Sequence, residues 1–128
     1  MAIHFSPDER FGGVRIEYSG TISEEDGRRA VDALAQLPDA SLDAPVLLDF
    51  SDCDALELTA GAAFMAGTFL SALSVRYTGR DAAIVMPAGR IPRGFSPERI
   101  GIAFGHRVRA HLFRDVGAAC EVLRRTAA

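Results

Sequence analysis

The stretch PVLLDFSDCDALELTAGAAFMAGTFLSALS, residues 45–74, decides the fold of this chain. Residues 46–48 form an unbroken apolar run, which is typical of a strand buried on both faces of a parallel sheet. We therefore expect a strand over residues 46–50 and an acidic loop over residues 51–57. Thr59 then offers a hydroxyl at the start of a helix over residues 59–74. In open α/β folds, functional groups gather in the polar loop between such a strand and its helix.

The segments on either side alternate between strand and helix patterns. Two short strands, at residues 2–5 and 14–18, flank a glycine-rich turn and predict an N-terminal hairpin. A helix opens at the capping box Ser23-Glu24-Glu25-Asp26. The later elements are a strand at 81–86, a helix at 97–104, a strand at 108–113 and a last helix capped by Asp115. The order β-β-α-β-α-β-α-β-α predicts a single α/β domain, residues 1–128, around a five-stranded mixed sheet that is mostly parallel.

Composition argues against several classes of protein. No apolar run approaches the ~20 residues of a membrane span. The N-terminal MAIHFSPDER has neither a basic region nor an apolar core, so we expect no signal peptide. Cys53 and Cys120 are the only cysteines and have no disulfide or metal spacing, which favours a cytoplasmic protein.

Charge is distributed unevenly along the chain. Residues 1–64 carry thirteen acids and four arginines, a net −9; residues 65–128 carry four acids and ten arginines, a net +6, which gives the overall −3. Every basic residue is arginine. A negative net charge, without lysine and without aromatic residues among the arginines, argues against nucleic-acid binding.

The element order and the segment VLLDFSDCDALELTAG resemble STAS domains, the SpoIIAA-like group that includes bacterial anti-sigma-factor antagonists. In that family a buried strand ends in an Asp-Leu-Ser-like turn, and Asp49-Phe50-Ser51 is similar to it. An acidic loop then leads to an Asp-Ser-Ser-Gly helix start, whose second serine a kinase can phosphorylate. Here 57–60 reads Glu-Leu-Thr-Ala, so the resemblance makes Thr59 the phosphoacceptor. The closing segment HLFRDVGAACEVL also resembles the STAS-like branch grouped with Sec14-type lipid-binding domains.

Two sets of residues are candidates for a functional site at the edge of the sheet where the parallel strands end. Five acidic or hydroxyl residues form a candidate interaction edge: Asp49, Ser51, Asp52, Asp54 and Glu57. Arg90 and Arg93 follow the next strand, and because parallel strands end at one edge of a sheet, we expect them beside these acids. They would form either surface ion pairs or an anion site. Thr59 itself is either a plain helix cap or a phosphoacceptor.

The helix at 59–74 is apolar around most of its circumference. Core packing explains such a helix. The alternative is that Phe64, Met65 and Phe69 line a site for a small apolar ligand between the helix and the sheet.

No catalytic set stands out. Neighbouring carboxylates should raise the pKa of the Cys53 thiol and make it a poor nucleophile, and no metal or cofactor motif is present. We therefore expect a non-enzymatic, STAS-like binding or regulatory module that contacts a protein partner or a second copy of itself through the loop and helix start after the third strand, with phosphorylation of Thr59 as its regulation. The alternative is a carrier of a small apolar or lipid-like ligand.

Overall fold

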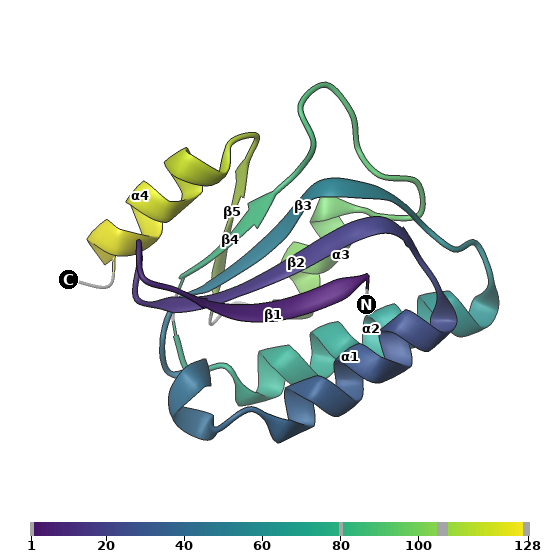
Figure 1. Ribbon diagram of the computed structural model, residues 1–128, viewed down its shortest axis with the longest axis horizontal. Coiled ribbons are helices and arrows are strands. Elements are labelled where there is room, and N and C mark those ends of the chain that lie inside the picture. The colour runs from purple at the N-terminus through teal and green to yellow at the C-terminus, as the bar shows by residue number, and fades with distance from the viewer. Residues whose placement is uncertain (1, 80, 105–107, 127–128) are drawn as a thin grey trace.

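The computed structural model describes residues 2–79, 81–104 and 108–126 of the chain (Figure 1). Five strands form one sheet in the order β1-β2-β3-β4-β5, with helices between and after them. The elements are β1 Ile3–Asp8, β2 Gly13–Ile22, α1 Glu24–Gln36, the short 3-10 helix η1 Asp39–Leu42, β3 Val46–Leu56, α2 Ala60–Arg76, β4 Asp81–Val85, α3 Pro97–Phe104, β5 Arg109–Phe113 and α4 Val116–Thr126. The predicted α/β class and element order are confirmed.

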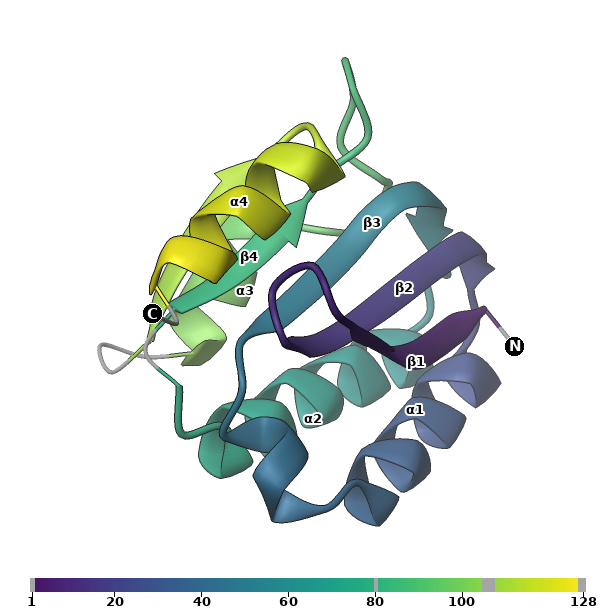
Figure 2. The ribbon, with the colours of Figure 1, turned by 60° about the vertical axis from the view of Figure 1, so that its left-hand side comes forward.

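The sheet is antiparallel only at its first pair of strands. β1 and β2 form a hairpin, and β2 through β5 run parallel to one another. Gly12 has a φ of 74° in the hairpin turn, a conformation that favours glycine. Since each parallel neighbour is reached through a right-handed crossover, α1, α2 and α3 share one face of the sheet and α4 covers part of the other (Figure 2).

Two apolar clusters hold these layers together. The larger lies between the sheet and α1, α2 and α3, and Ile16, Leu48 and Phe69 are among its buried members. The smaller lies under α4, where Leu123 packs on Leu47 and its neighbours in the sheet. Alternate residues of β3 therefore enter different clusters, as the period of a strand requires.

Local sequence signals explain where the helices begin. The Asp26 amide donates to the Ser23 hydroxyl (3.1 Å) and the Ser23 amide donates to the Asp26 carboxylate (2.9 Å), so the predicted capping box is present. The Ala118 amide donates to the carboxylate of Asp115 (2.9 Å) at the start of α4. None of the helices in the described ranges combines the length and the apolar character needed to cross a bilayer.

The predicted end of the third strand is wrong. We expected residues 51–57 to form a loop, but β3 continues to Leu56 and pairs with an equally extended β2. The physical reason is a period-2 pattern: Asp52 and Asp54 face solvent, and Cys53 between them is fully buried. The true connection to α2 is only the short segment 57–59.

Candidate functional site

The carboxyl ends of β3 and β4 meet the segment 86–96 at one edge of the sheet. Arg93 lies beside Ala55 in a parallel bridge. The Leu56 amide donates to the Arg93 carbonyl (2.6 Å), and the Arg93 amide donates to the Asp54 carbonyl (3.3 Å). The acidic and the arginine-bearing segments are thus neighbours, as expected from the parallel strands. We call seven of the exposed residues of this edge the strand-end rim: Asp52, Asp54, Glu57, Leu58, Thr59, Arg90 and Arg93.

One ion pair joins the two segments through their side chains. Arg90 Nη2 lies 3.3 Å from Asp54 Oδ1, and both side chains are exposed, to 45% and 68%. An exposed pair of this kind contributes about 0–1 kcal/mol, so it orients the groups more than it stabilises them. Arg114 Nη1 holds the loop after β4 in place by donating to the carbonyls of Pro87 and Arg90, each at 3.0 Å. The structure therefore gives Arg90 a carboxylate partner, and the anion site stays a prediction.

Asp49 and Ser51 do not lie on the rim. Asp49 is 3% exposed and sits on the face of the sheet that α4 partly covers. Its carboxylate accepts hydrogen bonds from Arg15 Nη2 (2.6 Å), from the Ser51 amide (2.9 Å) and from the Ser51 hydroxyl (2.6 Å). A buried carboxylate with this many donors is a structural group. The structure thus separates these two residues from the other three of the predicted edge.

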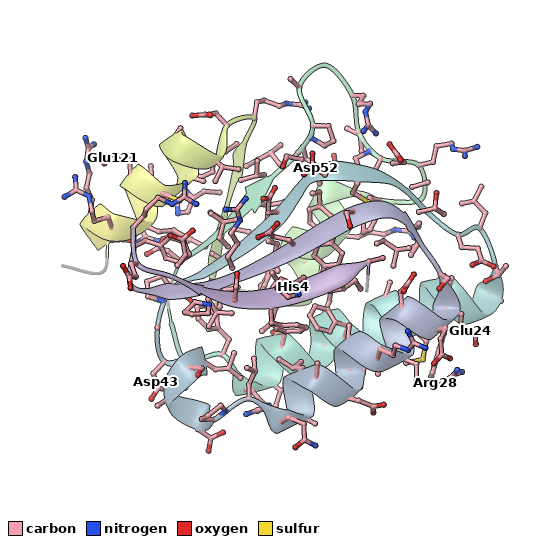
Figure 3. All side chains as sticks on the ribbon, in the orientation of Figure 1. His4, Glu24, Arg28, Asp43, Asp52 and Glu121 are labelled. Carbon is pink, nitrogen blue, oxygen red and sulfur yellow. The ribbon has the colours of Figure 1, made fainter. Side chains whose placement is uncertain are left out.

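The remaining acids project from the end of β3. Asp52, visible in Figure 3, and Asp54 point to solvent on either side of the inward-facing Cys53. Burial, with a smaller contribution from the Asp54 carboxylate, raises the pKa of the Cys53 thiol to about 11. The predicted direction is confirmed, but its main cause is burial and not the carboxylates. A thiol of this kind stays protonated and unreactive at neutral pH.

Thr59 is the N-cap of α2 and is itself exposed. Its Oγ1 accepts a hydrogen bond from the Ala62 amide at 3.0 Å, and its backbone has the extended conformation of a cap residue. The capping role is therefore present. Phosphorylation of the same hydroxyl stays a prediction.

Glu24 is a neighbour of this helix start that the sequence did not reveal. Its carboxyl group lies over Gly61 in the first turn of α2, where a side chain at position 61 would collide with it (Figure 3). A carboxylate in this place is stabilised by the positive end of the helix dipole. The available signal was topological: parallel crossovers begin at the same edge of a sheet, so the first turns of α1 and α2 are neighbours.

The three residues proposed for an apolar ligand do not share one surface. Phe69 is 3% exposed and meets Phe5 and Tyr18 edge to face, with ring centroids 6.0 and 6.5 Å apart. Met65 packs against Gly27 of α1, and Phe64 points outward with 71% of its surface exposed.

The space between α2 and the sheet is nearly filled. It holds a cavity of about 20 Å³, lined mostly by apolar side chains such as Tyr18, Phe50 and Phe69. This volume is close to that of a single water site. A ligand there would require α2 to move, and the carrier role stays a prediction.

A second polar cluster lies at the opposite end of the sheet. Asp81, 8% exposed at the start of β4, accepts a hydrogen bond from Arg109 Nη2 (3.2 Å) and lies 2.8 Å from His111 Nε2. These partners come from β5, about thirty positions along the chain, so sequence spacing gave no hint of them. The cluster satisfies a buried carboxylate. Across residues 2–79, 81–104 and 108–126, no three His, Cys, Asp or Glu side chains are grouped as metal ligands.

Comparisons with known proteins identify the fold. No protein-family model matches the chain, and no curated protein matches it. Among solved structures, the chain is similar to an uncharacterised protein of the DUF3478 family from Shewanella loihica PV-4, whose crystal structure is described as having a SpoIIAA-like fold. The TM-score is 0.59 at 18% identity, over 95% of this chain and 92% of that one. At this identity the likeness establishes the fold alone, and the fold is SpoIIAA-like.

Proposed function

We propose that this SpoIIAA-like domain is a non-enzymatic regulatory or binding module that recognises a protein partner through the strand-end rim. The observation that carries the proposal is Leu58, whose side chain is 76% exposed between the exposed Glu57 and Thr59. A large apolar residue surrounded by charged and polar groups is the composition of an interface centre with its polar margin. The exposed carboxylates favour a partner with a basic surface.

Thr59 is the proposed point of regulation. Its hydroxyl is exposed, and a phosphate there would add a charge of about −2 next to the acidic residues of the rim. Glu24 and Glu57 would repel the phosphate, whereas the α2 dipole and Arg90 would attract it, and Arg90 would then leave Asp54. Phosphorylation would thus change both the net charge of the rim and the position of its loop.

The chemistry of the rim supports binding in preference to catalysis. Cys53, which lies between Asp52 and Asp54 of the rim, is buried, and its thiol has a raised pKa. Among the histidines that the structure describes, His111 has a carboxylate partner, Asp81. This pair lies at the opposite end of the sheet from the rim. No described hydroxyl or thiol of the rim is hydrogen-bonded to a histidine, so the usual activation of a nucleophile is missing here. We place the module in the cytoplasm as part of this proposal.

Affinity capture from extracts of the source cells tests the proposed surface. Immobilised wild type, Leu58→Asp and Leu112→Asp are compared by quantitative mass spectrometry. Leu112 is the control, because it is also an exposed leucine, at 51% against 76% for Leu58, but lies on the edge strand β5. A partner retained by wild type and Leu112→Asp and lost with Leu58→Asp is expected. Equal retention by both variants would remove the rim from the interface.

The regulatory part has a separate test. Thr59→Ala and Thr59→Glu are compared in binding the captured partner, with wild type as reference. We expect Thr59→Ala to bind like wild type and Thr59→Glu to bind at least tenfold differently. Identical binding by the two variants would remove the phosphorylation switch and leave the binding surface intact.

A further inference from the structure

The outer face of α2 is apolar and exposed along its whole length. Its members are spaced at helical intervals on the side away from the sheet: Ala60, Phe64, Gly67, Ser71 and Val75. Phe64 is 71% exposed and Val75 is 83% exposed. No charged residue occurs between Thr59 and Arg76. A helix that is apolar all round is normally covered on every side.

The surface that covers this face must itself be neutral. A charged side chain placed against it would lose water without gaining a partner. The same face of a second copy of the chain meets this condition. Its large and small residues also complement each other: Phe64 lies beside a shallow hollow lined by Ala63, Gly67 and Ser71.

We propose that two copies of this chain associate through α2 packed antiparallel on α2, with a two-fold axis between Gly67 and Thr68. This register sets Phe64 of one copy opposite Ser71 of the other, and Val75 opposite Ala60. Each large side chain then meets a small one, and the glycine at the centre lets the backbones approach closely. The antiparallel arrangement also places opposite ends of the two helix dipoles together.

Charges on the neighbouring helix agree with this register. α1 runs beside α2 in the same direction, since Glu24 lies at Gly61 and Gly27 lies at Met65. Arg28 and Asp32 are exposed one turn apart on α1, on either side of the level of the proposed axis. Arg28, which is labelled in Figure 3, also pairs with Glu24 and Glu25 of its own helix. The two-fold reverses their order, so Arg28 of each copy faces Asp32 of the other.

The size of the face limits the area that the association can bury. α2 has 17 residues, so it is about 25 Å long and about 10 Å wide, on the order of 250 Å² for each copy. A standard interface buries roughly 800 Å² for each partner. The face of α2 alone falls short of this area, so the flanking α1 has to supply part of the difference, and we expect a weak dimer that exchanges with monomer.

Disulfide trapping tests the register. Thr68→Cys places a thiol next to its own symmetry mate, whereas Val75→Cys places it about 22 Å from its mate along the helix. Val75 is the more exposed of the two, so random collisions would favour the control. Cys53 and Cys120 are buried and do not compete. We expect Thr68→Cys to cross-link at least tenfold faster; equal or faster cross-linking of Val75→Cys would overturn the antiparallel register.

Analytical ultracentrifugation between about 5 and 500 µM tests the association itself. Wild type and Leu112→Asp should show the same monomer–dimer equilibrium, and Phe64→Asp should weaken it at least tenfold. Arg28→Asp and Asp32→Arg should each weaken it, and the double exchange should restore it, with circular dichroism confirming that each variant is folded. A wild type that stays monomeric throughout, or a Phe64→Asp variant that associates like wild type, would overturn the proposal. None of these outcomes depends on the strand-end rim.

Discussion

Replacing Asp49 by alanine should destabilise the protein strongly, although Asp49 lies in an acidic segment that reads as surface. The carboxylate is 3% exposed and accepts hydrogen bonds from Arg15 and Ser51. Removing one partner of a buried ion pair costs about 3–5 kcal/mol. Because the Arg15 side chain is 23% exposed and regains water, we expect about 3 kcal/mol for Asp49→Ala. Asp49→Asn retains the acceptor for Ser51 and should lose about half as much.

Urea denaturation followed by circular dichroism gives these free energies of unfolding. For a chain of this length, about 3 kcal/mol also corresponds to a fall of roughly 10 °C in Tm. Asp52→Ala is the matched control, because Asp52 lies on the same strand but is exposed, and it should stay within about 0.5 kcal/mol of wild type. The reasoning is refuted if Asp49→Ala unfolds at the same urea concentration as Asp52→Ala.

Three further predictions follow from local interactions. Thr59→Ala removes the cap of α2 and should lower the free energy of unfolding by about 1 kcal/mol, whereas Thr59→Ser should not; equal values in urea denaturation would contradict the capping role. Burial raises the pKa of the Asp26 carboxyl, but hydrogen bonds from the Ser23 backbone and hydroxyl outweigh it, so this pKa lies below its ordinary value. A lowered folded-state pKa stabilises the fold above the unfolded value, so the advantage of wild type over Asp26→Asn should be full at pH 7 and vanish as the pH falls below about 4; an advantage that does not change with pH would contradict this. Cys53, with its pKa raised to about 11, should resist iodoacetamide at pH 8 in the native protein and react in denaturant, as read by mass spectrometry; rapid native labelling would contradict its burial.

The element order could be predicted because its signals are local. The capping box at Ser23 and the cap at Thr59 each depend on residues three positions apart. The parallel order of β3 and β4 also brought Asp54 and Arg90 together as expected, since strand ends of a parallel sheet share one edge.

The details of the site depend on register, which one sequence does not reveal. Asp49 pairs with Arg15, 34 positions earlier, because β2 and β3 set Glu17 beside Asp49 and Arg15 beside Leu47 on the same face. The acidic composition of residues 51–57 suggested a loop. The alternation of Asp52, Cys53 and Asp54 was the better indicator, because it is the pattern of a strand with one buried face. Phe64 points outward because of the way α2 packs against its neighbours. The sequence does not reveal this orientation, because the apolar pattern of α2 is uniform around the helix.

Hydrogen exchange of the amides, measured with and without the captured partner, tests the proposed interaction surface most directly. Peptides that cover residues 52–62 and 88–95 should gain protection, and peptides from β5 and α4 should not change. Protection confined to β1, β5 or α4 would contradict the account, because the binding surface would then lie on another side of the molecule.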